Sequence, residues 1–116
     1  MNTPTILDLV PAYNALSKNI TDAKFIELIW EQLQKDISFL GESINELNRP
    51  SLHDIHNQLI DFLSHLSLSK LPELLYRIDI PEIQMSNFAL YSFEEIALLI
   101  LKREALKVYF RIRFAN

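Results

Sequence analysis

All three histidines of the chain lie between positions 53 and 65, and two of them have a carboxylate nearby. Asp54 follows His53 directly, and Asp61 precedes His65 by four positions. Imidazole and carboxylate groups are the usual ligands of zinc and iron. On a helix, however, Asp54, Asp61 and His65 share one flank, whereas His53 and His56 lie elsewhere on the surface. A metal would need ligands from other segments, so we expect solvated side chains and no metal site.

The dipeptide His53-Asp54 resembles the central pair of helical metal phosphohydrolases. Those enzymes use a His, a His-Asp pair and a further Asp. No histidine precedes His53 in this chain, so the first ligand of the pattern is missing. A small metal-dependent hydrolase is therefore the third of the functions that we consider.

Other catalytic templates are absent from the sequence. It contains no Glu-x-x-His pair, no His-Glu-x-x-His, no Gly-x-Ser-x-Gly and no phosphate-binding loop. The chain has no cysteine, which excludes thiolate chemistry, and a single glycine, which disfavours nucleotide-binding loops and many-stranded β folds. We predict a protein that is not an enzyme and that holds no metal and no cofactor.

Positive charge gathers near the C-terminus of a chain whose formal net charge is −4. Arg103, Lys107 and Arg111 recur at four-residue steps, so they would line one face of a helix, with Phe110 and Phe114 nearby. Such a face could contact the phosphates of nucleic acid or another polyanion. It could also match the negative end of the helix dipole and form ion pairs with acids of the same chain or of another subunit. We favour the second interpretation.

Three stretches have apolar residues at steps of three and four, the period of an amphipathic helix. We predict helices at about 22–47, 51–66 and 93–113, and hence an all-α fold, a small helical bundle. The first helix keeps this spacing over its full length and contains Gly41. The connection at 48–50 is short, so the first two helices should be antiparallel.

Capping residues at the ends of these helices, and polar and apolar faces along them, support the prediction. Thr21 or Asp22 can cap the first helix, and Ser51 and Ser92 can cap the other two. Glu27, Glu31 and Lys35 should form an outer polar face of the first helix. Its core residues should include Leu33, Ile37 and Leu40.

The remaining segments are less regular. Residues 1–20 read as an N-terminal arm with a short helix beginning near Pro11. Residues 70–80 are predicted to be a short helix, which Ser69 and Pro72 could open, or an extended piece. The segments 76–80 and 108–114 alternate well enough to be strands, so the alternative fold is α+β with a small sheet. The segment 75–82 has a distinctive sequence whose role the residue types do not reveal.

The run from Ile96 to Leu101 is apolar nearly all round, which requires cover on several sides. We therefore predict a non-enzymatic helical module for protein–protein interaction or self-association. The predicted state is a homo-oligomer whose subunits meet through the last helix. The candidate interface residues are Leu98, Leu101, Val108 and Tyr109. Binding of nucleic acid or another polyanion through the basic residues is the alternative.

The length of 116 residues fits a single domain. No apolar run approaches the ~20 residues that span a bilayer, so we expect no membrane contact. The N-terminus lacks the early positive charge and long apolar core of a signal peptide. Together with the absence of cysteine, these features lead us to expect a cytoplasmic protein.

Overall fold

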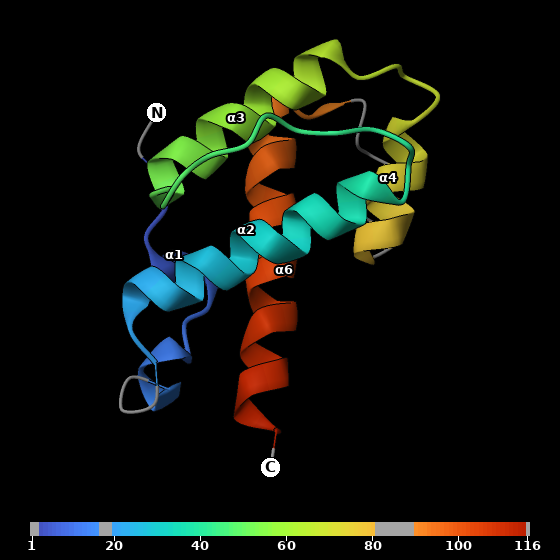
Figure 1. Ribbon diagram of the computed structural model, residues 1–116. Helices are drawn as coiled ribbons and strands as arrows, with labels where there is room; N and C mark the ends of the chain where they lie inside the picture. The colour runs from blue at the N-terminus through green and yellow to red at the C-terminus, as the bar shows by residue number, and fades with distance from the viewer. Residues whose placement is uncertain (1–2, 17–19, 81–89, 116) are drawn as a thin grey trace.

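The computed structural model describes residues 3–16, 20–80 and 90–115, and every regular element in these ranges is helical (Figure 1). The elements are α1 (Ile6–Leu9), the 3-10 helix η1 (Tyr13–Leu16), α2 (Asp22–Ser38), α3 (Leu52–His65), α4 (Leu71–Ile78) and α6 (Phe93–Arg113). The α-helices hold more than half of the chain. The predicted all-α fold is therefore confirmed. The α+β alternative is wrong for the described residues, because 76–78 and 108–113 are helical.

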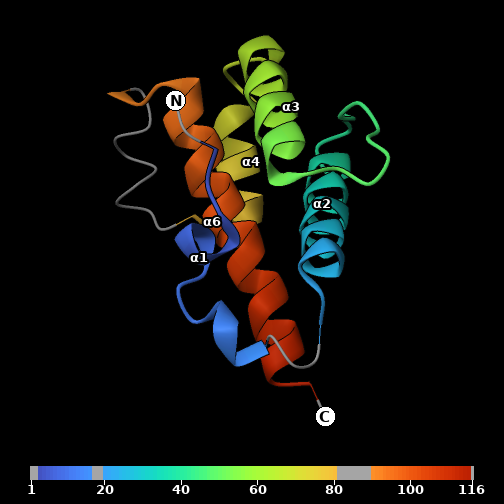
Figure 2. The same cartoon turned by 90° about the vertical axis from the view of Figure 1, so that its left-hand side faces the viewer.

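Helix α6 is the centre of the molecule. Among the described elements α1, η1, α2, α3 and α4 all contact it, and in Figure 2 α1 and α2 lie on opposite sides of it. Ile96, Ala97, Ile100 and Leu101 are buried as a result. The cover that the apolar run requires is thus supplied by other parts of the same chain.

Serine side chains fix the starts of α3 and α6, as their sequences predict. Ser51 Oγ accepts a hydrogen bond from the Asp54 amide at 3.1 Å, and Asp54 accepts one from the Ser51 amide at 3.0 Å. Ser92 and Glu95 make the same reciprocal pair at the start of α6, with both distances 3.1 Å. These capping boxes satisfy amides that have no partner within the helix.

Helix α2 ends at Ser38, so the predicted helix to residue 47 is wrong beyond that point. The Leu40 amide bonds to Ile37 O at 3.0 Å and the Gly41 amide to Ser38 O at 3.1 Å, which tightens the last turn. Gly41 then adopts φ +74°, a left-handed conformation that glycine reaches without steric cost. Ile44 is still buried, but it lies in a segment without regular secondary structure.

The early end of α2 also changes the direction of α3. Residues 42–50 run back along the molecule, so α2 and α3 point the same way in Figures 1 and 2 and are not antiparallel as predicted. Nine extended residues span up to about 30 Å. That reach exceeds the length of about 25 Å expected of α2, which has 17 residues. An irregular return segment can therefore cover the whole helix.

The described part of the N-terminal arm packs onto the bundle. Ile6 and Leu9 of α1 are buried, and α1 contacts α6. The Tyr13 hydroxyl donates a hydrogen bond to Asp22 Oδ1 at 2.7 Å, and its ring centroid lies 4.7 Å from that of Phe25. Burial, aided by this hydrogen bond and by the charge of Asp22, raises the pKa of Tyr13 to about 12. Regular structure spans 6–9 and 13–16, and the last part of the helix predicted from Pro11 lies outside the described residues.

Two leucines of the predicted core differ in burial, which gives a test of where α2 ends. Leu33 is fully buried, whereas Leu40 is half-buried beyond the end of the helix. We expect Leu33→Ala to lower the free energy of unfolding by about 2–5 kcal/mol. Leu40→Ala should cost clearly less, because solvent and neighbouring side chains can fill its place. Urea unfolding measures both values, and equal losses would contradict the structure.

Candidate functional site

A shallow apolar groove lies between the end of α2 and α4. We call it the α2–α4 groove, and its lining residues are Phe39, Leu40, Pro72, Glu73, Tyr76 and Arg77. Phe39 is 60% exposed and Tyr76 81% exposed. Two large aromatic side chains left in solvent beside each other are typical of a surface that binds another protein.

The sequence of α4 determines which side chains reach this groove. Its apolar stripe is buried, namely Leu71, Leu74, Leu75 and Ile78, so the opposite face presents Glu73, Tyr76 and Arg77. The helix ends at Asp79, whose φ of 72° is left-handed and whose amide bonds to the carbonyls of Leu75 and Tyr76. Arg103 Nη2 of α6 donates to Asp79 Oδ2 at 2.7 Å. This contact holds the end of α4 against α6.

Arg77 connects the groove with the interior. Its guanidinium carbon lies 3.6 Å from the centre of the Phe39 ring, a cation–π contact. Its Nε lies 3.7 Å from Asp36 Oδ1. The surface of the groove is thus linked through one side chain to a charged cluster beneath it.

This carboxyl cluster consists of Gln32 and Asp36 on α2 and Glu104 and Lys107 on α6. Asp36 is 2% exposed and Glu104 is fully buried. Lys107 Nζ lies 3.1 Å from Asp36 Oδ2 and 3.2 Å from Glu104 Oε1. Gln32 Nε2 donates to both oxygens of Asp36 at 3.2 Å. The cluster joins α2 to the middle of α6.

The two carboxyl groups titrate in opposite directions. Burial raises the pKa of Glu104 to about 9, and the hydrogen bond and charge of Asp36 act in the same sense, whereas Lys107 opposes them. Burial also acts to raise the pKa of Asp36, but hydrogen bonds with Glu104, Gln32 and Lys107 outweigh it and lower that pKa. At neutral pH the pair therefore holds one proton, on Glu104, and one negative charge, on Asp36.

The hydrogen-bond pattern agrees with a neutral Glu104. Among the described residues no donor makes a well-aligned hydrogen bond to either of its oxygens, although Lys107 Nζ lies 3.2 Å from Oε1. A protonated carboxyl can instead donate to Asp36. The pair is enclosed in protein, so no substrate reaches it in this conformation, in contrast to the open cleft of carboxyl-pair hydrolases. What the geometry allows is uptake and release of a proton.

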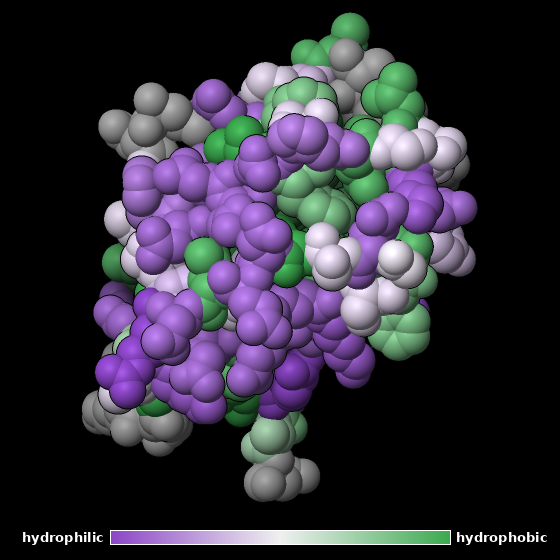
Figure 3. Space-filling model, turned by 45° about the horizontal axis from the view of Figure 1, so that its top comes forward, coloured by the Kyte–Doolittle hydropathy of each residue, from purple (hydrophilic) through white to green (hydrophobic). Residues whose placement is uncertain are grey.

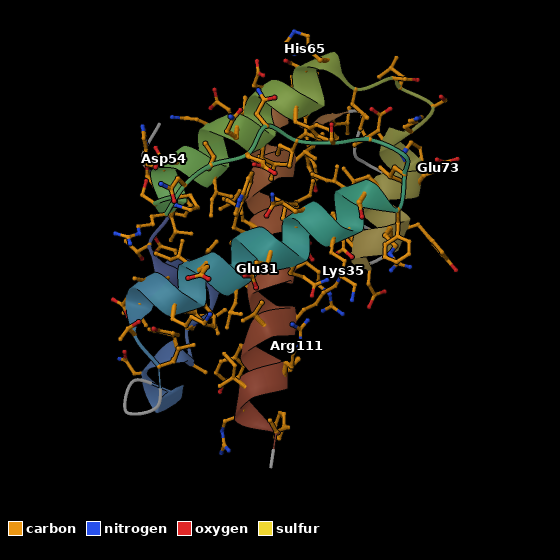
Figure 4. All side chains as sticks on the ribbon, viewed as in Figure 1. Glu31, Lys35, Asp54, His65, Glu73 and Arg111 are labelled. Atoms are coloured by element: carbon orange, nitrogen blue, oxygen red, sulfur yellow. The ribbon has the colours of Figure 1, made fainter. Side chains whose placement is uncertain are left out.

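The three predicted polyanion-binding residues all contact side chains of this chain. Arg103 pairs with Asp79, and Lys107 pairs with both acids of the carboxyl cluster. Arg111 donates a hydrogen bond to Gln32 from the part of α6 that lies beyond the crossing of α2 (Figure 4). The sequence favoured ion pairs within the chain or between subunits for these residues, and the contacts described here lie within the chain. Polyanion binding stays a prediction without new support.

The four predicted interface residues lie mainly inside the molecule. Leu101, Val108 and Tyr109 are buried, and Leu98 is half-buried against the core. Their neighbours are other helices of the same chain, so a prediction of self-association can no longer rest on them. Phe110 and Phe114, whose ring centres are 5.9 Å apart, are the exposed aromatic residues at this end of α6.

The carboxylate–histidine residues that suggested a metal site lie apart. Asp54 and His65 are at opposite ends of α3 in Figure 4. Asp61 Oδ1 lies 3.6 Å from His65 Nδ1 on the exposed surface, and Asp54 is occupied in the capping box. In the described ranges no three His, Cys, Asp or Glu side chains come together as a metal site would need.

The other two histidines have different surroundings. His53 is exposed, and its ring nitrogens lie 2.7 Å from Thr3 Oγ1 and 3.0 Å from Asn57 Nδ2. His56 is 4% exposed, so the expectation of a solvated side chain is wrong for it, and its Nε2 has no hydrogen-bond partner. His56 follows Leu52 by four positions and precedes Leu59 by three, which places it in the apolar register of α3.

The solvent side of α2 is polar. Glu27, Glu31 and Lys35 are exposed as predicted, and Figure 4 shows Glu31 and Lys35 on the outer side of the helix. In Figure 3 hydrophilic residues dominate the left half of the visible face, and apolar residues gather in its centre and toward its right-hand side. Within the described ranges, no helix has the length and apolarity needed to cross a membrane.

Sequence reasoning missed the two acids of the carboxyl cluster. Glu104 comes three positions after Leu101 and four before Val108, so it occupies a core position in the register of α6. Asp36 likewise comes three positions after Leu33. A charged residue in an apolar register was the available signal. Their pairing was not visible, because it depends on how α2 crosses α6.

Comparison of the chain with protein-family models, with curated proteins and with solved structures gives no match. Any functional conclusion therefore depends on the geometry of the groove and the cluster.

Lys107 provides the test of the cluster. Replacing it with methionine keeps most of the aliphatic stem and removes the ammonium that contacts both acids. We expect Lys107→Met to lower the free energy of unfolding at neutral pH by about 3 kcal/mol, because it leaves the Asp36 charge buried with less compensation. Lys102→Met, on the exposed side of the same helix, should change it by less than about 0.5 kcal/mol. Equal effects in urea unfolding would show that the cluster does not stabilise the fold.

Proposed function

We propose that this chain is a non-enzymatic self-association module, and that the α2–α4 groove binds the same groove of a second copy. The observation that carries the proposal is the pair of exposed aromatic residues, Phe39 and Tyr76, which line the α2–α4 groove. The hydrogen bond from Arg103 of α6 to Asp79 holds the end of α4, and so this side of the groove, in place. Aromatic side chains supply large apolar contact area at low entropic cost and are enriched at protein interfaces.

Charge complementarity favours a second copy as the occupant. Glu73 and Arg77 are one helical turn apart on the exposed face of α4, on either side of the middle of the helix. A two-fold contact between antiparallel α4 helices would place Glu73 of each copy opposite Arg77 of the other. The surface is therefore self-complementary in charge as well as apolar.

The size of the groove sets the expected strength of this contact. Stable complexes bury about 800 Å² on each partner. A groove built on six residues supplies less than that, so we expect a weak dimer that dissociates on dilution.

Binding of nucleic acid has less support. The three basic residues already donate hydrogen bonds within the chain: Arg103 to Asp79, Lys107 to Asp36 and Arg111 to Gln32. A polyanion would have to compete with these contacts. We therefore advance no second function.

Tyr76 is the residue to change. We expect Tyr76→Asp to abolish concentration-dependent dimerisation, because it places a charge in the apolar centre of the contact. Glu73→Arg should weaken the dimer, since it sets like charges opposite Arg77. Phe114→Asp, a matched change of an exposed aromatic residue far along α6, should leave the dimer intact. Sedimentation equilibrium over a concentration series measures the dissociation constants, and circular dichroism checks that each variant is folded.

Two results would contradict the proposal. One is a wild-type chain that stays monomeric up to roughly 1 mM, where the binding free energy would be weaker than about −4 kcal/mol. The other is a dimer that persists in Tyr76→Asp and is lost in Phe114→Asp, which would place the contact at the end of α6.

A further inference from the structure

Glu104 is a fully buried acid that self-association does not use. It lies at a core position of α6, and Lys107 Nζ is 3.2 Å from its Oε1. The same ammonium lies 3.1 Å from Asp36, so two buried acids share it. Burying a carboxylate is costly unless its charge is balanced. The burial of Glu104 therefore needs a way to balance the second acid.

The groups around Glu104 come from three helices. Asp36 and Gln32 approach from α2, Lys107 lies one turn away on α6 itself, and Arg77 reaches Asp36 from α4. In the described part of the chain, Asp36 and Lys107 are the charged groups that act on the Glu104 carboxyl. The buried titratable residue of α3 is His56.

The charge balance between the Asp36 and Glu104 carboxyl groups and the nearby cations depends on whether Glu104 holds a proton. With both acids ionised, two buried negative charges would share the Lys107 ammonium, and the only other cation near them would be the more distant Arg77, 43% exposed, whose Nε lies 3.7 Å from Asp36 Oδ1, as far as the described residues show. With Glu104 protonated, its hydroxyl can donate to Asp36, and the charge of Asp36 is balanced by Lys107 at 3.1 Å. The second arrangement satisfies the buried groups better, because breaking the balance of a buried ion pair is strongly unfavourable.

We infer that Glu104 is a proton-dependent lock between α6 and α2: the chain folds with one proton held between Asp36 and Glu104, and loss of that proton to solvent base loosens α2 from α6. The lock lies within one chain, so it can be tested whether or not the chain self-associates. Since Arg77 touches both Asp36 and Phe39, loosening α2 also disturbs the α2–α4 groove.

The sign of the pH dependence follows from the geometry. The pKa of Glu104 is raised from 4.5 to about 9 in the folded chain, so the folded state binds more protons than the unfolded state between these values. This group therefore makes the fold less stable as the pH rises from about 4.5 to 9, with no further change above that range. Inside the window the folding equilibrium constant should fall by up to tenfold for each pH unit.

Glu104→Gln tests the lock, because the amide imitates the neutral acid in size and can donate to Asp36. Urea unfolding of the wild type and Glu104→Gln between pH 5 and pH 10 gives the folding equilibrium constants. We expect the ratio of variant to wild-type constants to rise with pH up to about 9 and then to level off. Glu31→Gln, an exposed change on α2, should keep a ratio that does not vary with pH. A pH-independent ratio for Glu104→Gln would overturn the inference.

A measurement on the wild type covers the case in which the variant fails to fold. Carbon-13 NMR follows the carboxyl resonance of each glutamate during a pH titration. The Glu104 resonance should remain that of a neutral acid at pH 7 and change only at alkaline pH, together with shifts in α2 amides. A Glu104 carboxyl that ionises near pH 4.5, or one that ionises without any change in α2, would overturn the lock.

Discussion

The burial of α6 is the constraint on which the other elements depend. Its first half presents apolar side chains in nearly every direction, and five other described elements cover it. Because the chain is short, each covering element must come from a different part of the sequence, including the N-terminal α1. The irregular return at 42–50 fits the same need, since it allows α2 and α3 to lie across α6 in the same direction.

Charged groups then select how α2 crosses α6. Apolar side chains alone can pack two helices together in several registers. Asp36 of α2, in contrast, contacts Lys107 and Glu104 of α6 in only one register of the two helices. Buried charged clusters of this kind add little net stability compared with apolar residues, and they can instead favour one packing arrangement over others. In this chain the cluster is also connected to α4, because Arg77 lies between Asp36 and Phe39.

The structure shifts the basis of the functional proposal. The apolar residues that suggested an interface are largely buried in the core. The basic residues that suggested polyanion binding donate hydrogen bonds to other side chains of the same chain. The α2–α4 groove, in contrast, combines two exposed aromatic residues, Tyr76 and Phe39, with two opposite charges on α4. Self-association remains the proposed function, but it now rests on a surface that the sequence did not single out.

The sequence by itself determined the helices whose signals are local. Ser51 and Ser92 with their partner acids define where α3 and α6 begin, and the apolar period along 93–113 defines the central helix. The end of α2 was also encoded locally, in Gly41, but the apolar spacing that continues to Leu47 concealed it. Tertiary structure decided the direction of α3, the burial of His56 and the pairing of Asp36 with Glu104. These features depend on contacts between residues far apart in the chain, and no local pattern contains the crossing geometry that brings α2, α4 and α6 together.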